Sequence, residues 1–105
     1  MAVLNFDSVI AACVTPFTED TEVDFQRLAG HGRWLASIEG ITGILCNGHA
    51  GEGLAMSEDE RTEVIRCLAA AMGGSLPIIA GIVSEGTRVA AAEAKRAAKV
   101  LHLRL

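Results

Sequence analysis

The sequence predicts an α/β fold in which three parallel strands alternate with three helices. Three apolar runs, at residues 9–17, 41–47 and 77–83, show no alternation of polar and apolar side chains. Such continuous runs are typical of strands that are covered on both faces, as in parallel sheets. Each run is followed by a segment with helical spacing, and strands joined through helices form right-handed crossovers and a parallel sheet.

The first run, VIAACVTPF, leads into a helix that we expect from Asp24, its N-cap, to about Ser37. Gly30 and Gly32 weaken this helix by roughly 1 kcal/mol each relative to alanine. The apolar face at helical spacing consists of Phe25, Leu28, Gly32 and Leu35.

The second run, ITGILCN, precedes a helix whose start carries a capping box, with Ser57 as the cap and Glu60 reaching back to it. Gly73 and Gly74 end the helix, and Pro77 follows. Its expected buried stripe consists of Val64, Leu68 and Met72, flanked by Ile65 and Ala69.

The third run, PIIAGIV, precedes a helix that begins near Thr87. The side chains expected to be buried are Ala90, Ala94, Ala97 and Leu101. Those expected to face water are Arg88, Lys95, Arg96 and Lys99.

Composition narrows the range of functions. The chain has 105 residues and a formal net charge of −4, without a Lys/Arg cluster, so nucleic acid and acidic membranes are poor partners. The N-terminal residues lack the basic start of a signal peptide, and no apolar run spans a membrane. Cys13, Cys46 and Cys67 have no CxxC spacing and are expected to be buried, reduced thiols, which favours the cytoplasm.

Chemistry is expected at the carboxyl ends of the strands, where both closed barrels and open parallel sheets place their sites. The second strand is followed by the loop GHAGEG at residues 48–53. Its glycines would turn backbone N–H groups toward a carboxylate or phosphate, while His49 would donate a hydrogen bond or move a proton. Alternatively, the glycines only make a tight turn. A metal site of His49, Glu52 and Cys46 is disfavoured because nothing fixes these residues on one face.

Several linked motifs in order resemble the dihydrodipicolinate synthase and N-acetylneuraminate lyase family. VTPFTEDTEVDFQRL resembles that family's first strand, its TPF turn and the start of its first helix. GHAGEGLAMSEDER is similar to its GTTGE loop and the S-E-x-E-R helix start, and LPIIAGIVSEGT is similar to its third strand. The resemblance covers roughly residues 9–99.

The resemblance implies a (β/α)8 TIM barrel, usually tetrameric, of which residues 1–105 form a single incomplete domain with the first three βα units. A whole barrel takes roughly 250 residues. It also implies a lyase or class I aldolase that makes or breaks carbon–carbon or carbon–oxygen bonds of pyruvate or a related 2-oxo acid, without a cofactor. There a lysine forms a Schiff base with the substrate and a tyrosine relays protons.

Carried over to this sequence, the resemblance places the substrate-binding site at the second loop. Gly48, Gly51 and Glu52 match the family motif, whereas His49 and Ala50 replace its two threonines. Ala50 lacks a hydroxyl, so only its backbone N–H can contact a carboxylate. His49 remains a candidate for the proton relay, and a divergent aldolase or dehydratase is favoured over the lysine-pathway enzyme.

Two residue types that this chemistry needs are missing from the chain. There is no tyrosine, and the only lysines, Lys95 and Lys99, lie on the predicted exposed face of the third helix. We therefore expect the chain alone to be inactive and to self-associate. The tail VLHLRL lacks a turn residue, which suggests a truncation or frame change near Val100. The alternatives are a non-catalytic module that binds an anion at residues 48–53 or pairs with another barrel fragment, and a small enzyme that uses His49 and Glu52.

Overall fold

The protein forms three successive βα units. The structure, a computed structural model, describes residues 7–102. The elements are β1 (Val9–Ala12), α1 (Phe25–Ala36), β2 (Ile41–Cys46), the short 3-10 helix η1 (Gly53–Ala55), α2 (Glu58–Met72), β3 (Ile78–Ala80) and α3 (Thr87–Val100). Residues 1–6, which carry most of the start judged not to be a signal peptide, and residues 103–105 of the apolar tail lie outside the described residues.

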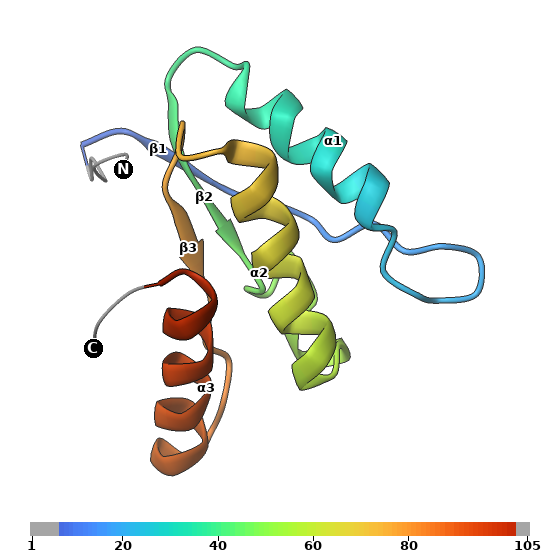
Figure 1. Ribbon diagram of the computed structural model, residues 1–105, viewed down its shortest axis with the longest axis vertical. Helices are drawn as coiled ribbons and strands as arrows, with labels where there is room; N and C mark the ends of the chain where they lie inside the picture. Colours follow the sequence, from blue (N-terminus) through green and yellow to red (C-terminus); the bar gives the residue numbers. More distant parts are fainter. Residues whose placement is uncertain (1–6, 103–105) are drawn as a thin grey trace.

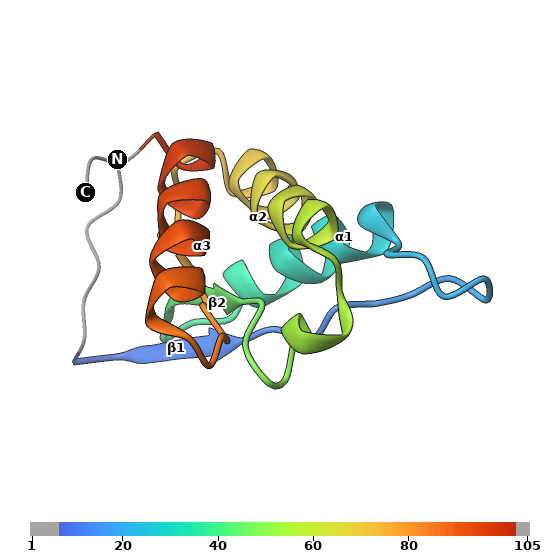
Figure 2. The same cartoon turned by 90° about the horizontal axis from the view of Figure 1, so that it is seen from below.

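The strands form one parallel sheet, as predicted, and their order in it is β1-β2-β3 (Figure 1). Figure 2 shows the three helices together on one side of this sheet. Of the cover expected on both faces, residues 7–102 supply the cover of one face. Val14, on the opposite side from buried Cys13, is 52% exposed.

Two strands are shorter than the apolar runs that predicted them. The first run continues past β1 with a bond from Cys13 N to Leu45 O, but Pro16 has no N–H and the chain turns away there. In the third run, Gly81 N still bonds to Cys46 O at 2.7 Å. Pairing then stops because β2 ends at Cys46.

Helix α1 begins where the sequence predicts. Asp24 accepts a hydrogen bond from Arg27 N at 3.0 Å, and Leu28, Gly32 and Leu35 are buried. Phe25, expected in the same stripe, is 39% exposed. At 100° per residue it lies at the margin of the stripe centred on Leu28 and Leu35, so the helices beside α1 do not cover it.

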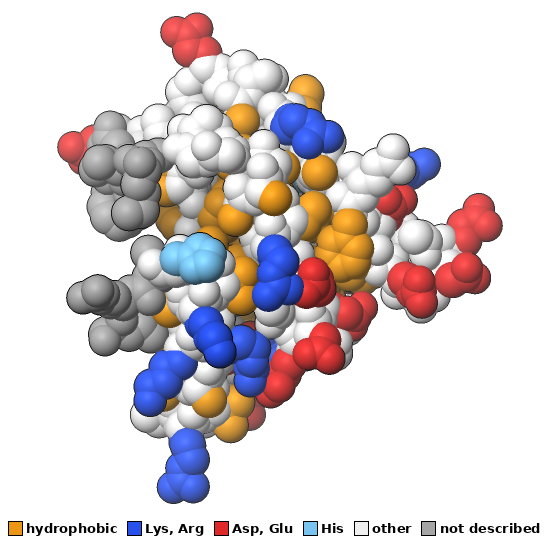
Figure 3. Space-filling view, viewed as in Figure 1, with side chains coloured by type: hydrophobic (Ala, Val, Ile, Leu, Met, Phe, Trp, Pro, Cys, Tyr) orange, Lys and Arg blue, Asp and Glu red, His pale blue; other side chains and the backbone are white. Residues whose placement is uncertain are grey.

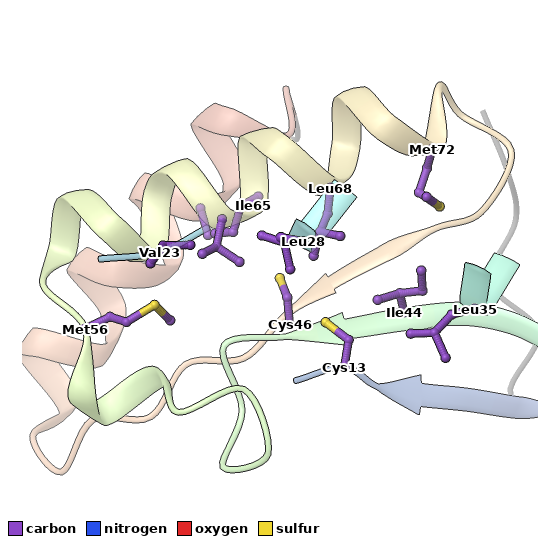
Figure 4. Close-up of a cluster of buried hydrophobic side chains, with 12 residues drawn as sticks. Cys13, Val23, Leu28, Leu35, Ile44, Cys46, Met56, Ile65, Leu68 and Met72 are labelled. Atoms are coloured by element: carbon purple, nitrogen blue, oxygen red, sulfur yellow. The ribbon is translucent and has the colours of Figure 1, made fainter. Parts of the chain in front are cut away.

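Helix α2 carries the complete capping box, since Glu60 N donates to Ser57 Oγ and Ser57 N donates to Glu60 Oε1. The helix ends at Gly73, whose φ of 56° suits glycine. Its predicted stripe is buried over the sheet. Figure 4 shows the resulting cluster, which joins α2 to α1 and the sheet through Leu28, Leu35, Ile44, Ile65, Leu68 and Met72.

Helix α3 differs from its predicted pattern at charged positions. Ala97 is buried and Ala90 and Ala94 are half-buried, but Glu93 is buried as well. Arg96, expected to face water, is half-buried because it pairs with Glu58 of α2 at 3.1 Å. The helix ends without a glycine, and His102 adopts a φ of 57° in the turn that follows.

Charge is unevenly distributed on the face seen in Figure 3. Lys and Arg side chains gather over α3 and the adjoining part of α2, while acidic side chains gather toward the segment before α1 and the start of α2. Among residues 7–102 no helix is long and apolar enough to cross a membrane.

Candidate functional site

An open hollow lies at the carboxyl edge of the sheet, where β2 and β3 end. Its volume is about 700 Å³. The wall is mostly apolar, with a histidine, a serine and an acid at the rim. It is lined by Leu45, Gly48, His49, Leu54, Gly81, Ile82, Val83, Ser84 and Glu85. The structure therefore brings the loop after β2 and the loop after β3 to one place, as their position after parallel strands predicts.

The loop after β2 folds back tightly on its own start. Asn47, with a φ of 59°, turns the chain out of β2, and Glu52, with a φ of 56°, turns it toward η1. A Cβ on Gly53 would lie 2.3 Å from Asn47 O, and one on Gly51 would lie 3.1 Å from both Asn47 N and Cys13 O. These two glycines are therefore needed for close approach of the protein's own backbone.

Four consecutive backbone N–H groups at the tip of this loop have no hydrogen-bond acceptor among residues 7–102. They belong to residues 48–51, whereas Glu52 N and Gly53 N bond back to His49 O and Gly48 O at 3.1 Å each. Successive unpaired N–H groups in a turn form a concave donor set for an anion. The loop therefore has four backbone donors that are not used within residues 7–102.

The predicted site residues occupy different depths. Gly48 and His49 line the hollow, with His49 exposed at its rim. Ala50 and Glu52 are exposed and do not line it, while Gly51 is buried beneath the loop.

Two polar side chains that are not among the predicted site residues hold the loop in place. Buried Thr15 donates from Oγ1 to Gly51 O at 2.7 Å. Asn47 donates from Nδ2 to Arg61 O at 3.0 Å, while its buried Oδ1 has no partner in the described structure. The one available signal was residue type, because asparagine before a glycine is favoured where φ is positive.

Arg61, in the first turn of α2, reaches three further groups around the loop. Its Nη1 donates to Met56 O at 2.6 Å and to Gly53 O at 3.3 Å, and its Nε donates to Glu93 Oε1 at 2.5 Å. Ser84 Oγ donates to Glu93 Oε2 at 2.9 Å. Sequence patterns missed this network because its members lie on four separate segments.

The cysteines lie behind the site. Cys13, directly after β1, lies beside Cys46 at the end of β2, beneath α2 (Figure 4). Burial raises the pKa of the Cys13 thiol to about 11 and that of Cys46 to about 12. Cys67, expected to be buried, is half-buried, and burial raises its pKa too. All three are free thiols, and the raised values favour the unreactive protonated form.

The described residues at this edge of the sheet offer neither a metal-binding cluster nor a lysine. Within residues 7–102, no cluster of three or more His, Cys, Asp and Glu is arranged to hold a metal ion. Lys95 and Lys99 are both exposed on α3, and neither lines the hollow.

Comparison with known proteins gives a consistent result. Residues 5–100 match the model of the dihydrodipicolinate synthetase family. A 4-hydroxy-tetrahydrodipicolinate synthase from Cyanothece sp. is 37% identical over 99 residues, which cover 91% of this chain and 32% of that protein.

Solved structures agree in fold. A dihydrodipicolinate synthase from Bacillus anthracis aligns with a TM-score of 0.85 and 28% identity, covering 93% of this chain and 33% of that one. The chloride-inhibited dihydrodipicolinate synthase from Acinetobacter baumannii, complexed with pyruvate, aligns with a TM-score of 0.84 and 32% identity, covering 89% and 32%. The three βα units thus match the first units of a TIM barrel, and the chain spans about a third of the length of these relatives.

Proposed function

This chain belongs to the dihydrodipicolinate synthetase family, and we propose that it forms the part of a lyase site that holds the carboxylate of a 2-oxo acid such as pyruvate. The observation that carries the proposal is the run of four unpaired backbone N–H groups at residues 48–51, beside the hollow at the carboxyl edge of the sheet. A related structure with pyruvate supports the choice of ligand.

The residues proposed for binding are Gly48, His49, Ala50 and Gly51, through their backbone N–H groups, with Glu52 holding the turn that presents them. His49 stands exposed at the rim, so its imidazole is the candidate for proton transfer to or from the bound substrate. Burial of a 2-oxo acid against Leu45 and Val83 would exclude water from its methyl end.

We expect no turnover by residues 1–105 alone. A Schiff base requires an uncharged amine next to the substrate carbonyl. Lys95 and Lys99 lie exposed on α3, and neither lines the hollow where the substrate carbonyl would bind. We propose a single incomplete domain that binds the 2-oxo acid and, as a family member, works within an oligomeric barrel lyase.

The test is an NMR titration of the 105-residue chain with pyruvate. We expect the amide signals of residues 48–51 to shift, with acetate, which lacks the 2-oxo group, binding more weakly. Ala50→Thr restores a hydroxyl next to the donor set and should tighten pyruvate binding roughly two- to tenfold, the range of one net hydrogen bond. Ala55→Thr, at an exposed position of η1, is the matched control. Shifts scattered over the surface, or none, would contradict the proposal.

A second function shares the same observation. The unpaired N–H groups would also suit a phosphate, so the chain would then be a non-catalytic anion-binding module or one that pairs with another barrel fragment. Inorganic phosphate that displaces pyruvate from residues 48–51 at lower concentration than pyruvate itself would favour this alternative.

A further inference from the structure

One ion pair joins the two loops that form the hollow. Arg61 of α2 and Glu93 of α3 meet at 2.5 Å, and their side chains are only 20% and 9% exposed. On one side, Arg61 Nη1 bonds to Gly53 O, at the end of the loop after β2. On the other, Glu93 Oε2 accepts from Ser84 Oγ in the loop after β3.

Both loops line the hollow. Gly48, His49 and Leu54 come from one loop, and Ser84 and Glu85 come from the other. The planar guanidinium has several donors in a fixed arrangement, so it fixes direction as well as distance between the groups it joins. A shift of the pair would therefore move Gly53 and Ser84 relative to each other.

A contribution to folding stability does not by itself explain the buried Arg61–Glu93 pair. Desolvation of two buried charges offsets most of their attraction, so a buried ion pair commonly adds little to stability. A second pair, Arg96–Glu58, joins the same two helices at 3.1 Å, is more exposed, and within the described residues makes no hydrogen bond to either loop. The Arg96–Glu58 pair, outside the hollow, therefore already links α2 to α3.

We propose that Arg61 and Glu93 are positioning residues that set the separation of the two loops and thereby the shape of the 2-oxo-acid hollow. The proposal rests on the proposed function for the identity of the ligand, but not for the arrangement of the loops. Neither residue lines the hollow or touches the substrate; both act through Gly53, Met56 and Ser84.

The test compares two variants of the pair with a control on the same helices. Glu93→Gln keeps the shape of the side chain and removes its charge. Arg61→Lys keeps the positive charge but lacks the two guanidinium nitrogens that donate to Gly53 O and Glu93 at the same time. Arg96→Gln is the control. Amide hydrogen exchange followed by NMR on the 105-residue chain reports the bonds of Gly53, Ala55, Met56 and Gly81 separately from those of α1.

We expect exchange at Gly53, Ala55 and Met56 to rise roughly tenfold in both variants, with α1 unchanged. Arg61→Lys loses the charged hydrogen bond to Gly53 O, and Glu93→Gln removes the charge that holds the Arg61 guanidinium in place to make it. Pyruvate affinity should fall by a similar factor, and Arg96→Gln should alter neither. Equal acceleration throughout the chain, or the same effect in Arg96→Gln, would overturn the proposal. If the unmodified chain binds no pyruvate, the proposed function fails, while the exchange pattern still decides the role of the pair.

Discussion

Gly53 makes the tightest backbone contact of the candidate loop. A Cβ there would lie 2.3 Å from Asn47 O, a backbone atom that cannot yield, whereas a Cβ on Gly48 would meet only the flexible end of Leu45 at 2.8 Å. We expect Gly53→Ala to destabilise the fold by about 1–3 kcal/mol or more, as overpacking does. Gly48→Ala should cost less, because the Leu45 methyl can rotate away.

Urea unfolding of the two alanine variants measures this difference. The unmodified chain is the reference, and Gly30→Ala, at a site with nothing within 4 Å of the added Cβ, is a control for alanine itself. Equal losses at positions 48 and 53 would show that the loop relaxes and that Asn47 O does not hold Gly53.

The buried thiols make stability fall at alkaline pH. A thiol has an ordinary pKa near 9, and burial raises it to about 11 for Cys13 and about 12 for Cys46. The folded state therefore favours protonated thiols. Its advantage is complete below about pH 9 and declines as pH rises toward 11–12, by about 1.4 kcal/mol per pH unit and thiol.

Urea unfolding at pH 7, 9 and 10.5 tests this dependence, with Cys46→Val as a variant that removes one titrating group. A smaller slope in the variant is expected. A native-state reaction with a disulfide reagent should modify half-buried Cys67 first, and rapid modification of Cys46 would contradict the burial on which the prediction rests.

At the residue scale, the position of the loop at residues 48–53 was predictable from the sequence, but the hydrogen bonds that hold it in place were not. Gly48 and His49 were placed at the carboxyl edge correctly, because position after a parallel strand fixes the side of the sheet. Thr15 and Gly51 are 36 residues apart, so their hydrogen bond follows from strand order and register. A single sequence does not state that register.

Among the elements, α2 offers the clearest test of local sequence. Ser57 and Glu60 cap each other's backbone, and both hydrogen bonds are present. Ser57→Ala removes the side-chain acceptor for Glu60 N and should lower the free energy of unfolding by about 1 kcal/mol. Thermal unfolding followed by circular dichroism measures the loss.

Ser37→Ala is the matched control. Ser37 is the C-cap of α1, and its exposed hydroxyl donates only to Trp34 O. We expect a few tenths of a kcal/mol there. Equal effects at both serines would mean that the capping box contributes no more than an ordinary surface hydroxyl.

Helix boundaries were predictable because caps and glycines act within a few residues. The buried face of α3 was less so. Its alanine stripe was expected. Helical periodicity assigns charged residues to the solvent side, but Glu93 is buried because it pairs with Arg61, 32 residues earlier in the chain. The ends of β1 and β3 were also mispredicted. β1 stops near Pro16, which has no N–H, and β3 stops where its neighbour β2 ends, and an apolar run in the sequence shows neither limit.

At the scale of the molecule, one sheet face lacks a cover among the described residues. The helices lie on the other face (Figure 2). The sheet order leaves β1 and β3 each with an unpaired edge in this part of the chain. Unpaired strand edges and exposed apolar side chains favour association. We therefore expect the 105-residue chain to increase in apparent mass with concentration in light scattering.

Val14→Lys tests which surface is responsible. Val14 projects from the uncovered face at 52% exposure, and Val89 on the outside of α3 is similarly exposed at 59%. Because a buried lysine must shed its hydration, Val14→Lys should shift the chain toward the monomer, while Val89→Lys should leave its association unchanged. A monomer at all concentrations, with a sharp concentration-independent thermal transition, would show that the uncovered face is stable in water.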